Sequence, residues 1–499
     1  VGTFTGGIAS SNHISGGAIA VFVLDVATFS GGISNSGALS ATVDGIEVEN
    51  GSTFGGDIAN SSSGTISAQT GIFVRSVPTF AGNITNSGAI AGGQIGIRIA
   101  GSTITGAIVD SGIITASSHG ILIDAASEVV TSKTAISISG STFTGGISNS
   151  GTISAGNIGI LLSGASTFTG DIDNSGTIGA ATAIDVSNAL SAVTINQTAG
   201  LIFGAIKLSV NADQLNVSGG AINGNILGAG SSDTINFNLG SGTFTYGAAY
   251  GFSGINQVNI NSGTLVLNGV NNATAIDVFG TLAGIGTLDP LTLTIHSGGT
   301  LAPGTPGVPG TSMAIVGNLA FQSGALYAVY LNPTAATLAN VVGTATLTGA
   351  TVNAQFASGS YLPNKKYTIL SASGGLGGTA FAGLTNSNLP AGFTDQLSYD
   401  YADGDVILNL TAELGAIGNS GLNVNQRDVA NALNNFFNSG GALPLNFVNV
   451  FRLTGPGLGN ALTQLDGEAA TGAETSAFQL TNVALEPMTA SPCAVLLPP

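Results

Sequence analysis

The chain has 499 residues, of which 77 are glycine, 43% are apolar and only 7% are charged. Eight basic residues against 25 acidic ones give a formal net charge of −17, which argues against a nucleic acid or an anionic membrane as the main partner. The single cysteine excludes an internal disulfide, and three histidines leave little for a histidine-based metal site, so we expect no cofactor. No apolar run reaches the roughly 18 residues that a membrane-spanning helix needs.

One short phrase returns along the first third of the chain. Residues 28–37 read TFSGGISNSG, and residues 142–151 read TFTGGISNSG. Related phrases are anchored at Phe4, Phe54, Phe80, Ile104 and Phe168, which gives successive spacings of 25, 25, 26, 24, 39 and 25 residues. A fixed period of this length is the signature of a repeat architecture, in which each unit stacks on its neighbours.

Each repeat contains three short segments in which apolar and small polar residues alternate. The first segment directs Phe29 and Ile33 inward, the second carries Leu39, and the third carries Ile46 and Val48. Alternation of this kind, bounded by Gly and Asn-Ser-Gly, predicts strands and turns. We therefore predict an all-β fold, a right-handed parallel β-helix with about 25 residues and three strands per coil. Equivalent residues should stack from coil to coil, Phe on Phe and Ile on Ile, and the turn asparagines should form one ladder: Asn35, Asn60, Asn86, Asn149 and Asn174.

The single spacing of 39 residues points to residues 124–134. This segment holds Asp124, Glu128 and Lys133, three of the few charges in the region. We expect a loop that leaves the stacked coils and that can be removed. Such a loop is either a tolerated insertion or a recognition loop, and in the second case these three residues are the candidate binding residues.

The composition changes three times after the regular repeats. We predict regular β-helix repeats over 1–190, a less regular continuation over 191–300, a C-terminal β cap of the autochaperone type over 301–410, and a helical linker or tail over 411–499. The cap region is rich in tyrosine and proline. Helical spacing of apolar residues appears at 424–437, at 457–465 and at 467–485.

The second half of the chain resembles a known family. Residues 280–288 (GTLAGIGTL), 297–304 (SGGTLAPG) and 343–350 (GTATLTGA) look like the C-terminal part of autotransporter passenger domains, and residues 461–469 (ALTQLDGEA) resemble the segment before the translocator barrel. The resemblance covers roughly 260–486. It implies a passenger that crosses the outer membrane and is then displayed or released outside the cell. The family's outer-membrane translocator barrel has no counterpart in this chain, so the resemblance implies that the chain is a fragment or a passenger cut from a longer gene.

A serine protease is one alternative. Residues 310–314 (GTSMA) are similar to the sequence around the nucleophile of subtilisin-like proteases, and Asp44 and His119 precede Ser312 in the order of that family. The flanking residues depart from the family pattern, because no Ser or Thr lies between Asp44 and the next Gly, and no Pro follows residue 314. Moreover, Asp44 and His119 should lie three coils apart in one column, about 14 Å at the spacing of strands in a sheet.

Other sites are weaker. Residues 228–235 (GAGSSDTI), with Asp233 and the more distant Asp213, resemble one imperfect copy of the calcium-binding repeat of β-rolls, which needs several copies. A glycan-active enzyme would need clustered charges. However, the outward column beside the third segment shows no carboxylates on adjacent coils; it reads Glu47, Phe73, Arg98, Leu122, Leu161 and Asp185.

The leading hypothesis is a non-catalytic adhesin or spacer at the cell surface. Its expected partner is a glycan or protein on a host or neighbouring cell. A glycan-active or subtilisin-like hydrolase is the first alternative. Self-assembly is the second, because Val1 begins within a repeat and the first coil would expose an unpaired strand edge that favours head-to-tail association.

Overall fold

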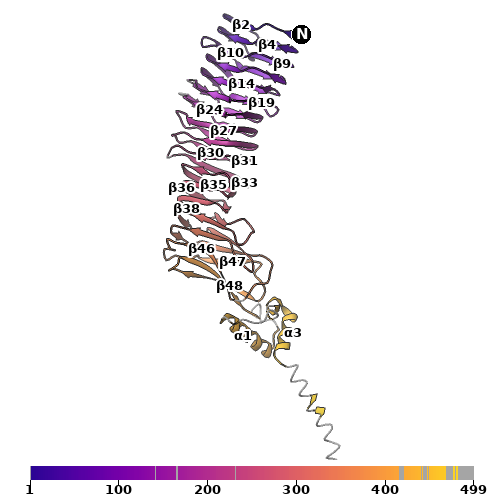
Figure 1. Cartoon of the computed structure of the whole chain (residues 1–499), viewed down its shortest axis with the longest axis vertical. Helices are drawn as coiled ribbons and strands as arrows, with labels where there is room; N and C mark the ends of the chain where they lie inside the picture. Colours follow the sequence, from indigo (N-terminus) through magenta and orange to yellow (C-terminus); the bar gives the residue numbers. More distant parts are fainter. Residues whose placement is uncertain are drawn as a thin grey trace, which may run out of the picture.

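The protein is a parallel β-solenoid, as the repeats predict. A computed structural model describes residues 2–140, 142–164, 167–230, 232–362, 364–414, 421–439, 441, 447, 449–467, 476–477 and 479–480. The described residues form about 14 turns of about 25 residues, followed by a short helical part. Figure 1 shows the coils stacked in one column, with the N-terminus at one end and helices α1 and α3 beyond the other.

Each regular coil passes through two hydrogen-bonded sheets that enclose the core. In one coil, β5 and β6 belong to sheet A, and β7 and β8 belong to sheet B; the first predicted segment is divided into β5 and β6. The sheet A strands of this part are β1 (Thr3–Phe4), β2 (Ile8–Ser10), β5 (Thr28–Phe29), β6 (Ile33–Asn35), β9 (Thr53–Phe54), β10 (Ile58–Asn60), β12 (Thr79–Phe80), β13 (Ile84–Asn86), β15 (Thr103–Ile104), β16 (Ile108–Asp110), β19 (Glu128–Thr131), β20 (Thr134–Ile138), β23 (Thr152–Ala155), β24 (Ile158–Ser163) and β27 (Thr177–Asn188). The sheet B strands are β3 (His13–Ser15), β4 (Ile19–Leu24), β7 (Ala38–Ser40), β8 (Asp44–Glu49), β11 (Thr65–Arg75), β14 (Ala89–Ala100), β17 (Ile113–Ala116), β18 (His119–Ile123), β21 (Thr142–Thr144), β22 (Ile147–Asn149), β25 (Thr167–Thr169) and β26 (Ile172–Asn174).

The alternation in the sequence determines which side chains enter the core. In β6, Ile33 and Asn35 are buried while Ser34 is exposed, and in β10 and β13 the outer two residues are likewise buried while the middle one is half-buried. The third segment of successive coils ends at a residue whose backbone is in the left-handed region, with φ between 54° and 56°. These residues are Asp25, Asn50, Ser76 and Gly101. Short polar residues and glycine tolerate this backbone conformation, which turns the chain at the corner of each coil.

The predicted aromatic stacks are confirmed, and they are two rather than one. Phe4, Phe29, Phe54 and Phe80 stack in sheet A with ring centroids 5.0, 4.8 and 4.6 Å apart. Phe143 and Phe168 stack in sheet B, 5.5 Å apart. The column of Phe80 continues through Ile104 and Val129 in sheet A, so the phenylalanines change sheet between these two groups.

The asparagine ladder is divided at the same place. Asn35, Asn60 and Asn86 donate in turn to the next residue at 2.9, 2.8 and 2.7 Å, and the series ends on Asp110 in sheet A. A second series in sheet B runs from Asn149 to Asn174 and Gln197, at 2.8 and 2.7 Å. All these side chains are buried and also bind turn backbone. The single ladder predicted from the sequence is therefore two ladders on opposite sheets.

Residues 124–138 cause this change of sheet, because they form strands of the solenoid. The prediction of a loop at 124–134 is therefore wrong. Strand β19 pairs with β15 and β23, and β20 pairs with β16 and β24, so the segment occupies sheet A. It supplies half a coil. The next phrase, which begins at Thr142, consequently stacks on β17 in sheet B, where earlier coils carry their second segment. From here the two halves of the repeat have exchanged sheets.

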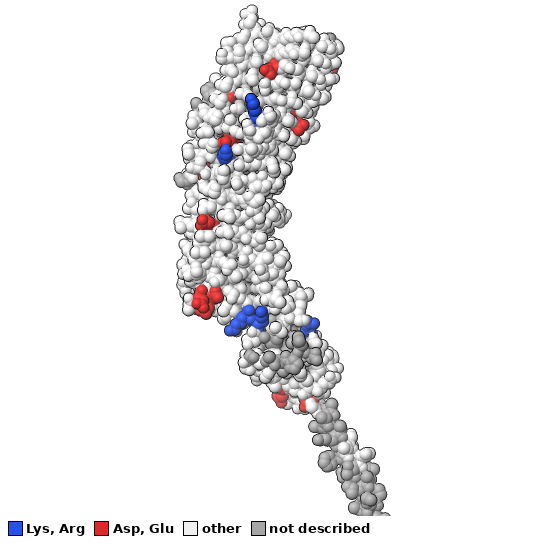
Figure 2. Space-filling view, in the orientation of Figure 1, with Lys and Arg blue, Asp and Glu red and all other residues white. Residues whose placement is uncertain are grey.

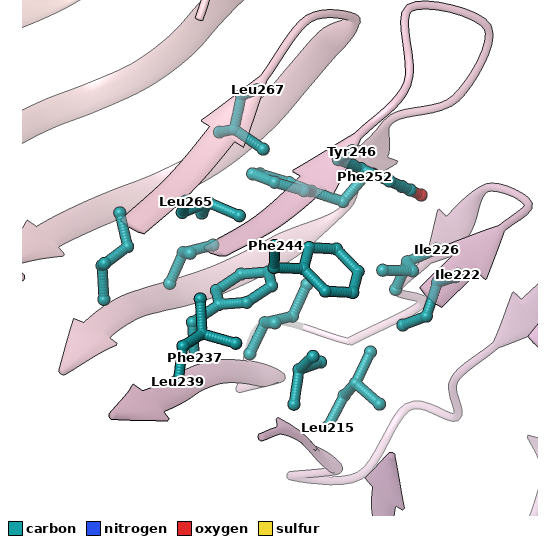
Figure 3. Packing of buried hydrophobic residues seen from close by; sticks show 14 of the residues in the cluster. Leu215, Ile222, Ile226, Phe237, Leu239, Phe244, Tyr246, Phe252, Leu265 and Leu267 are labelled. Atoms are coloured by element: carbon teal, nitrogen blue, oxygen red, sulfur yellow. The ribbon is translucent and has the colours of Figure 1, made fainter. Parts of the chain in front are cut away.

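After β27 the coils become shorter. Asn196 and Asn216 are in register 20 residues apart, and Asn272 lies beside Asp289 only 17 residues later. Larger side chains fill the core there: Phe237, Phe244, Tyr246 and Phe252 lie together in Figure 3. The strands of this part are β28 (Thr194–Gln197), β29 (Leu201–Lys207), β30 (Gln214–Val217), β31 (Ala221–Asn223), β32 (Ile226–Leu227), β33 (Thr234–Tyr246), β34 (Phe252–Ser253), β35 (Ile255–Leu267), β36 (Val270–Val278), β37 (Thr281–Gly284) and β38 (Thr287–Ile295).

The solenoid ends in an antiparallel layer. Strand β49 pairs antiparallel with β46 and with β48, whereas β47 still pairs parallel with β45. The strands of this part are β39 (Thr300–Pro303), β40 (Ser312–Ile315), β41 (Asn318–Phe321), β42 (Leu326–Leu331), β43 (Leu338–Val341), β44 (Ala345–Thr346), β45 (Thr351–Phe356), β46 (Lys365–Ala372), β47 (Gly383–Ser387), β48 (Phe393–Asp400) and β49 (Asp405–Ala412). An antiparallel end closes the stack because its last strand no longer offers the register of a further parallel coil.

Two predicted helices are confirmed beyond the last strand. They are α1 (Val424–Asn438) and α3 (Gly455–Leu465), joined through the 3₁₀ turn η1 (Asn449–Arg452). Asn434 and Asn438 of α1 exchange hydrogen bonds with the backbone of Leu414 and Ala412, so α1 satisfies the polar backbone at the end of β49. The third predicted helix, at 467–485, lies mostly outside the described residues. None of the described helices has both the length and the apolar character to cross a bilayer.

Candidate functional site

Charged side chains gather on the outer surface of sheet B in the early coils. Most of the face in Figure 2 is uncharged, and the acidic and basic residues on it lie singly or in small groups along the column. The third segments of four coils place Phe22, Glu47, Phe73 and Arg98 in one outward column, and Glu49 lies beside Arg75 in the neighbouring column. Strand geometry therefore brings together residues that lie about one or two coils apart in the sequence. We call this group, with Asp44 and Asp124, the charge cluster.

Two arginines organise the charge cluster. Arg75 lies with Nε 3.0 Å from Oε1 of Glu47 and with Nη2 2.6 Å from Oε2 of Glu49. Arg98 donates from Nε and Nη2 to Oδ2 of Asp124, at 3.2 and 2.9 Å. Both guanidinium groups lie against the ring of Phe73, 5.5 and 5.0 Å from its centroid. Each arginine is thus held by a carboxylate and an aromatic ring, which fixes its orientation.

Two carboxyl groups of the charge cluster are hard to ionise. Burial raises the pKa of Asp44 and of Glu47 above their ordinary values, and the nearby charge of Asp44 raises the pKa of Glu47 further. Arg75 acts in the opposite direction on both groups but does not reverse the shift. Only 4% of the Glu47 side chain is exposed, which explains the dominance of burial. Carboxyl groups shifted in this way beside arginines are typical of functional sites as well as of structural ion-pair networks.

An open groove of about 410 Å³ lies beside the charge cluster, at the bend between the second and third segments. Its lining comprises small and neutral residues: Ala41, Thr42, Ser67, Ala68, Gln69, Ala91, Gly92, Gly93 and Thr115. Asp44 follows this bend directly in the chain. A ligand in the groove could form hydrogen bonds with its polar lining, and the charge cluster beside it supplies the ionisable side chains.

The three residues of the protease alternative do not converge. Asp44, Thr70, Ile95 and His119 follow one another in register, so Asp44 and His119 lie three coils apart, as the sequence predicts. His119 interacts through Nδ1 with Oγ of Ser118 at 2.8 Å. Ser312 begins β40, which pairs with β38 and β43 far along the column. Nucleophilic catalysis needs a hydroxyl, an imidazole and a carboxylate within hydrogen-bond reach, and the fold separates these groups.

Of the three candidate binding residues at 124–134, one joins the charge cluster. Asp124 binds Arg98, while Glu128 enters β19 between Thr103 and Thr152. Lys133 lies at the turn between β19 and β20, where its backbone carbonyl accepts hydrogen bonds from Asn157 and Ile158. The half-coil therefore contributes to the site through its first residue.

The residues of the calcium alternative stabilise turns. Asp213 accepts backbone N–H groups of Val193 and Ser209, at 2.7 and 2.5 Å, and Asp233 accepts the backbone N–H of Asp213 at 3.2 Å. Both side chains are fully buried in the same column. Among the described residues, no three His, Cys, Asp or Glu side chains are grouped closely enough to hold a metal ion.

Glu49 and Arg75 are missing from the predicted site. Within their own outward column, Glu47 and Arg98 are single charges two coils apart. The register shows that Arg75 lies beside Glu49 in the next column, where it reaches both glutamates. Opposite charges separated by about one period, as Glu49 and Arg75 are, would have indicated this pair. Comparison of the sequence with protein-family models and with curated proteins finds no match.

Proposed function

We propose that this chain is an extracellular β-helical passenger that acts as an adhesin or a spacer, without catalysis of its own. The solenoid fold is consistent with a passenger-like or structural protein. The observation that carries the proposal is the long stack of nearly equivalent coils, whose outward positions are mostly small and neutral. Such a surface suits many shallow contacts spread along the column rather than one deep site.

The resemblance of residues 260–486 to autotransporter passengers supports the extracellular part of the proposal. A single cysteine agrees with passage through a narrow pore, because no internal disulfide closes a loop. Stacked coils contact only their sequence neighbours, so folding can proceed from one end after the chain emerges. The partner that we propose is a glycan or protein on another cell surface.

The direct test is the binding of the purified, fluorescently labelled chain to cultured epithelial cells and to immobilised mucin. We expect saturable binding that the unlabelled chain displaces and that a heat-denatured sample does not reproduce. Casein and a panel of polysaccharides are incubated with the same sample. Cleavage of either class would overturn the non-catalytic proposal.

A glycan-active hydrolase remains the second candidate, and one observation favours it. Asp44 and Glu47 are neighbouring carboxyl groups with raised pKa values beside arginines and next to a groove. A glycosidase uses one protonated and one ionised carboxyl group. If the chain cleaves a polysaccharide, Glu47→Gln should abolish the cleavage and Glu128→Gln, which lies outside the charge cluster, should not.

A further inference from the structure

A third row of hydrogen-bonded amides runs along the outer surface of sheet B, on the coils that follow the half-coil. Asn196, Asn216, Asn236 and Asn259 occupy one outward column in register. Asn216 donates to Asn196 at 2.9 Å, Asn236 to Asn216 at 2.9 Å, and Asn259 to Asn236 at 2.8 Å. These side chains are half-buried, in contrast to the two inner ladders, so this outer row faces the solvent.

The outer row extends further at both ends. Asn196 donates to Oδ2 of Asp171 at 3.0 Å and to Oδ1 of Asp173 at 2.7 Å. At the other end, Gln257 donates to Asn259 at 2.9 Å and to Asp277 at 2.8 Å. Nε2 of His296 lies 2.8 Å from Asp277, and its Nδ1 lies 3.1 Å from Oε1 of Gln322. A continuous network therefore connects Asp171 to Gln322.

The network orients its members and leaves part of their hydrogen-bonding capacity free. Asn216, Asn236 and Asn259 each donate one N–H and accept one bond within the row. A primary amide has two N–H groups and two lone pairs, so one of each remains on every one of these side chains. The free groups repeat at the distance between neighbouring strands, about 4.8 Å. Because the row already holds the side chains in place, a ligand loses little free energy in ordering them.

A groove of about 530 Å³ runs beside the end of the outer row. Its polar lining includes Asn272, Asp289 and Asn318, and its apolar lining includes Leu291 and Val316, whose exposed fractions are 68% and 40%. Leu291 directly precedes Thr292, which is in register with Asn318 at the start of β41. His296 and Gln322 directly follow the ends of these two strands, β38 and β41. The groove and the network therefore form one surface.

The ionisable groups of this surface restrict the ligand. Asp171, Asp173, Asp277 and Asp289 are acidic, and no Lys or Arg belongs to the network or to the groove lining among the described residues. A polyanion would be repelled. Phe279 stacks on His296 with ring centroids 4.1 Å apart and stays 46% exposed, so an apolar contact lies next to the polar row.

We propose that the outer row and its groove bind a neutral polysaccharide chain that lies along the axis of the solenoid. Hydroxyl groups both donate and accept hydrogen bonds, which matches the one free N–H and one free lone pair of each amide. The C–H faces of the sugar rings contact Leu291, Val316 and the exposed part of Phe279. This proposal rests on the proposed adhesin function and assigns a surface and a ligand class to it.

The experiment is native gel electrophoresis of the full chain in gels that contain a dissolved polysaccharide. The neutral probes are laminarin, mannan, dextran and galactomannan, and the anionic probe is polygalacturonate. We expect at least one neutral polymer to retard the chain and polygalacturonate to leave its mobility unchanged. Retardation by none of the neutral polymers, or by polygalacturonate alone, would overturn the proposal.

Three variants locate the binding surface. Gln322→Ala removes an exposed end of the network and should weaken retardation about fivefold, the effect of one hydrogen bond of about 1 kcal/mol. The double variant Asn216→Leu with Asn236→Leu interrupts the middle of the row and should abolish retardation. Asn223→Leu makes the same change at an exposed position of sheet A and should leave retardation unchanged. Equal retardation of all three variants would place the ligand elsewhere and overturn the proposal.

Thermal unfolding of each variant separates loss of binding from loss of fold. If the double variant unfolds, Gln322→Ala decides the outcome, because it truncates an exposed side chain outside the core. The cell-binding experiment distinguishes this proposal from the adhesin function. Attachment to cells without retardation by any neutral polymer overturns the polysaccharide surface only, and retardation without attachment to cells or mucin overturns the adhesin function only.

Discussion

Asn86 donates a hydrogen bond of 2.7 Å to Asp110, and this bond ends the inner ladder of sheet A one coil before the half-coil. Asp110 is fully buried, and its Oδ2 finds no hydrogen-bond partner among the described residues. In the next coil Ile138 takes the equivalent position, so no further amide can continue the series. Oδ1 of Asp110 also accepts the backbone N–H of Gly112 at 3.3 Å, whereas Oδ2 lacks both solvent and a donor.

The first prediction follows from Asp110. Burial raises the pKa of Asp110 to about 6, from 3.8. The folded chain thus holds this proton more tightly than the unfolded chain, and the free energy of unfolding should decrease as the pH rises from about 4 to about 6. Asp110→Asn removes this pH dependence and should stabilise the protein at pH 7 by about 3 kcal/mol. Chemical denaturation of both proteins at pH 4 and at pH 7 measures this difference. The idea fails if Asp110→Asn is equally stabilising at pH 4 and pH 7.

The second prediction concerns the stacked cores. Phe143 is fully buried against Phe168, so Phe143→Ala should cost about 3–5 kcal/mol. Thr169 lies next to Phe168 and is exposed, so Thr169→Ala should change stability by less than about 0.5 kcal/mol. Thr144 is a poor control, because its hydroxyl exchanges two hydrogen bonds with the backbone of Ala116. Similar losses for Phe143→Ala and Thr169→Ala in denaturant melts would contradict the register.

The third prediction concerns the half-coil. Deletion of residues 128–141 joins the end of β18 to Thr142 with the spacing found in earlier coils. Thr142 and Phe143 would then stack on Thr103 and Ile104, and the two inner ladders would merge into one. We expect this variant to fold with a melting temperature close to that of the parent chain.

A deletion that ignores the repeat provides the control. Removal of residues 124–134 takes out the whole of β19 and the first residue of β20, and leaves the rest of β20 out of register with β16, so we expect unfolding or aggregation of the coils around it. Circular dichroism and size-exclusion chromatography distinguish the two variants. If the second deletion is the better tolerated one, residues 124–134 are not a part of the stack.

The fourth prediction concerns the charge cluster. Arg75→Met leaves Glu47 and Glu49, with exposed fractions of 4% and 16%, without their cation. The loss at pH 7 should be about 1–3 kcal/mol, reduced from that of a fully buried pair because Arg75 is itself 42% exposed. Since burial raises the pKa of Glu47, protonation at pH 4 should remove most of this loss.

Arg98→Met is the matched control for this change. Its partner Asp124 keeps 30% of its side chain exposed, so water can solvate the carboxylate when the guanidinium is gone. We expect a loss below about 1 kcal/mol, with little dependence on pH. Equal effects of the two substitutions in denaturant titrations would show that burial of the glutamates is not the cause.

The fifth prediction concerns the closing layer. A fragment of residues 1–290 ends within β38 and exposes core residues such as Leu288 together with an unpaired strand edge, so it should aggregate on refolding. A fragment of residues 191–414 contains the antiparallel layer of β46, β48 and β49 and should refold and resist protease. Limited proteolysis with mass spectrometry tests this. A stable 1–290 fragment and a degraded 300–410 region would reverse these assignments.

The sequence predicts the coils well because each one repeats the same alternation. Ile33, Ile58 and Ile84 are spaced by one period and are all buried in register. It does not reveal the half-coil, because inward Val129 and Ile136 alternate just as the regular segments do. Glu128 and Lys133 suggested a loop, but a strand tolerates charges that point outward. Both halves of the repeat offer the core an apolar side chain at every second residue, so either half fits either sheet.

The candidate sites were harder to predict than the fold. Arg75 reaches Glu47 diagonally across two columns, and a comparison of single columns cannot show such a contact. The outer row could have been found, since Asn196, Asn216 and Asn236 are spaced by 20 residues. That period differs from the one in the first part of the chain, and a search at one fixed period passes over it.

The exchange of sheets at residues 124–138 has a consequence for a molecule that binds the outer surface of the solenoid. Before this point the Thr-Phe phrase presents its outward residues on sheet A, and after it the same phrase presents them on sheet B. A neighbour that recognises this phrase would approach the first coils from one side and the coils after Thr142 from the other. Because of the half-coil, the solenoid presents the same sequence pattern on two opposite sides, so one pattern can contact partners on both sides of the molecule.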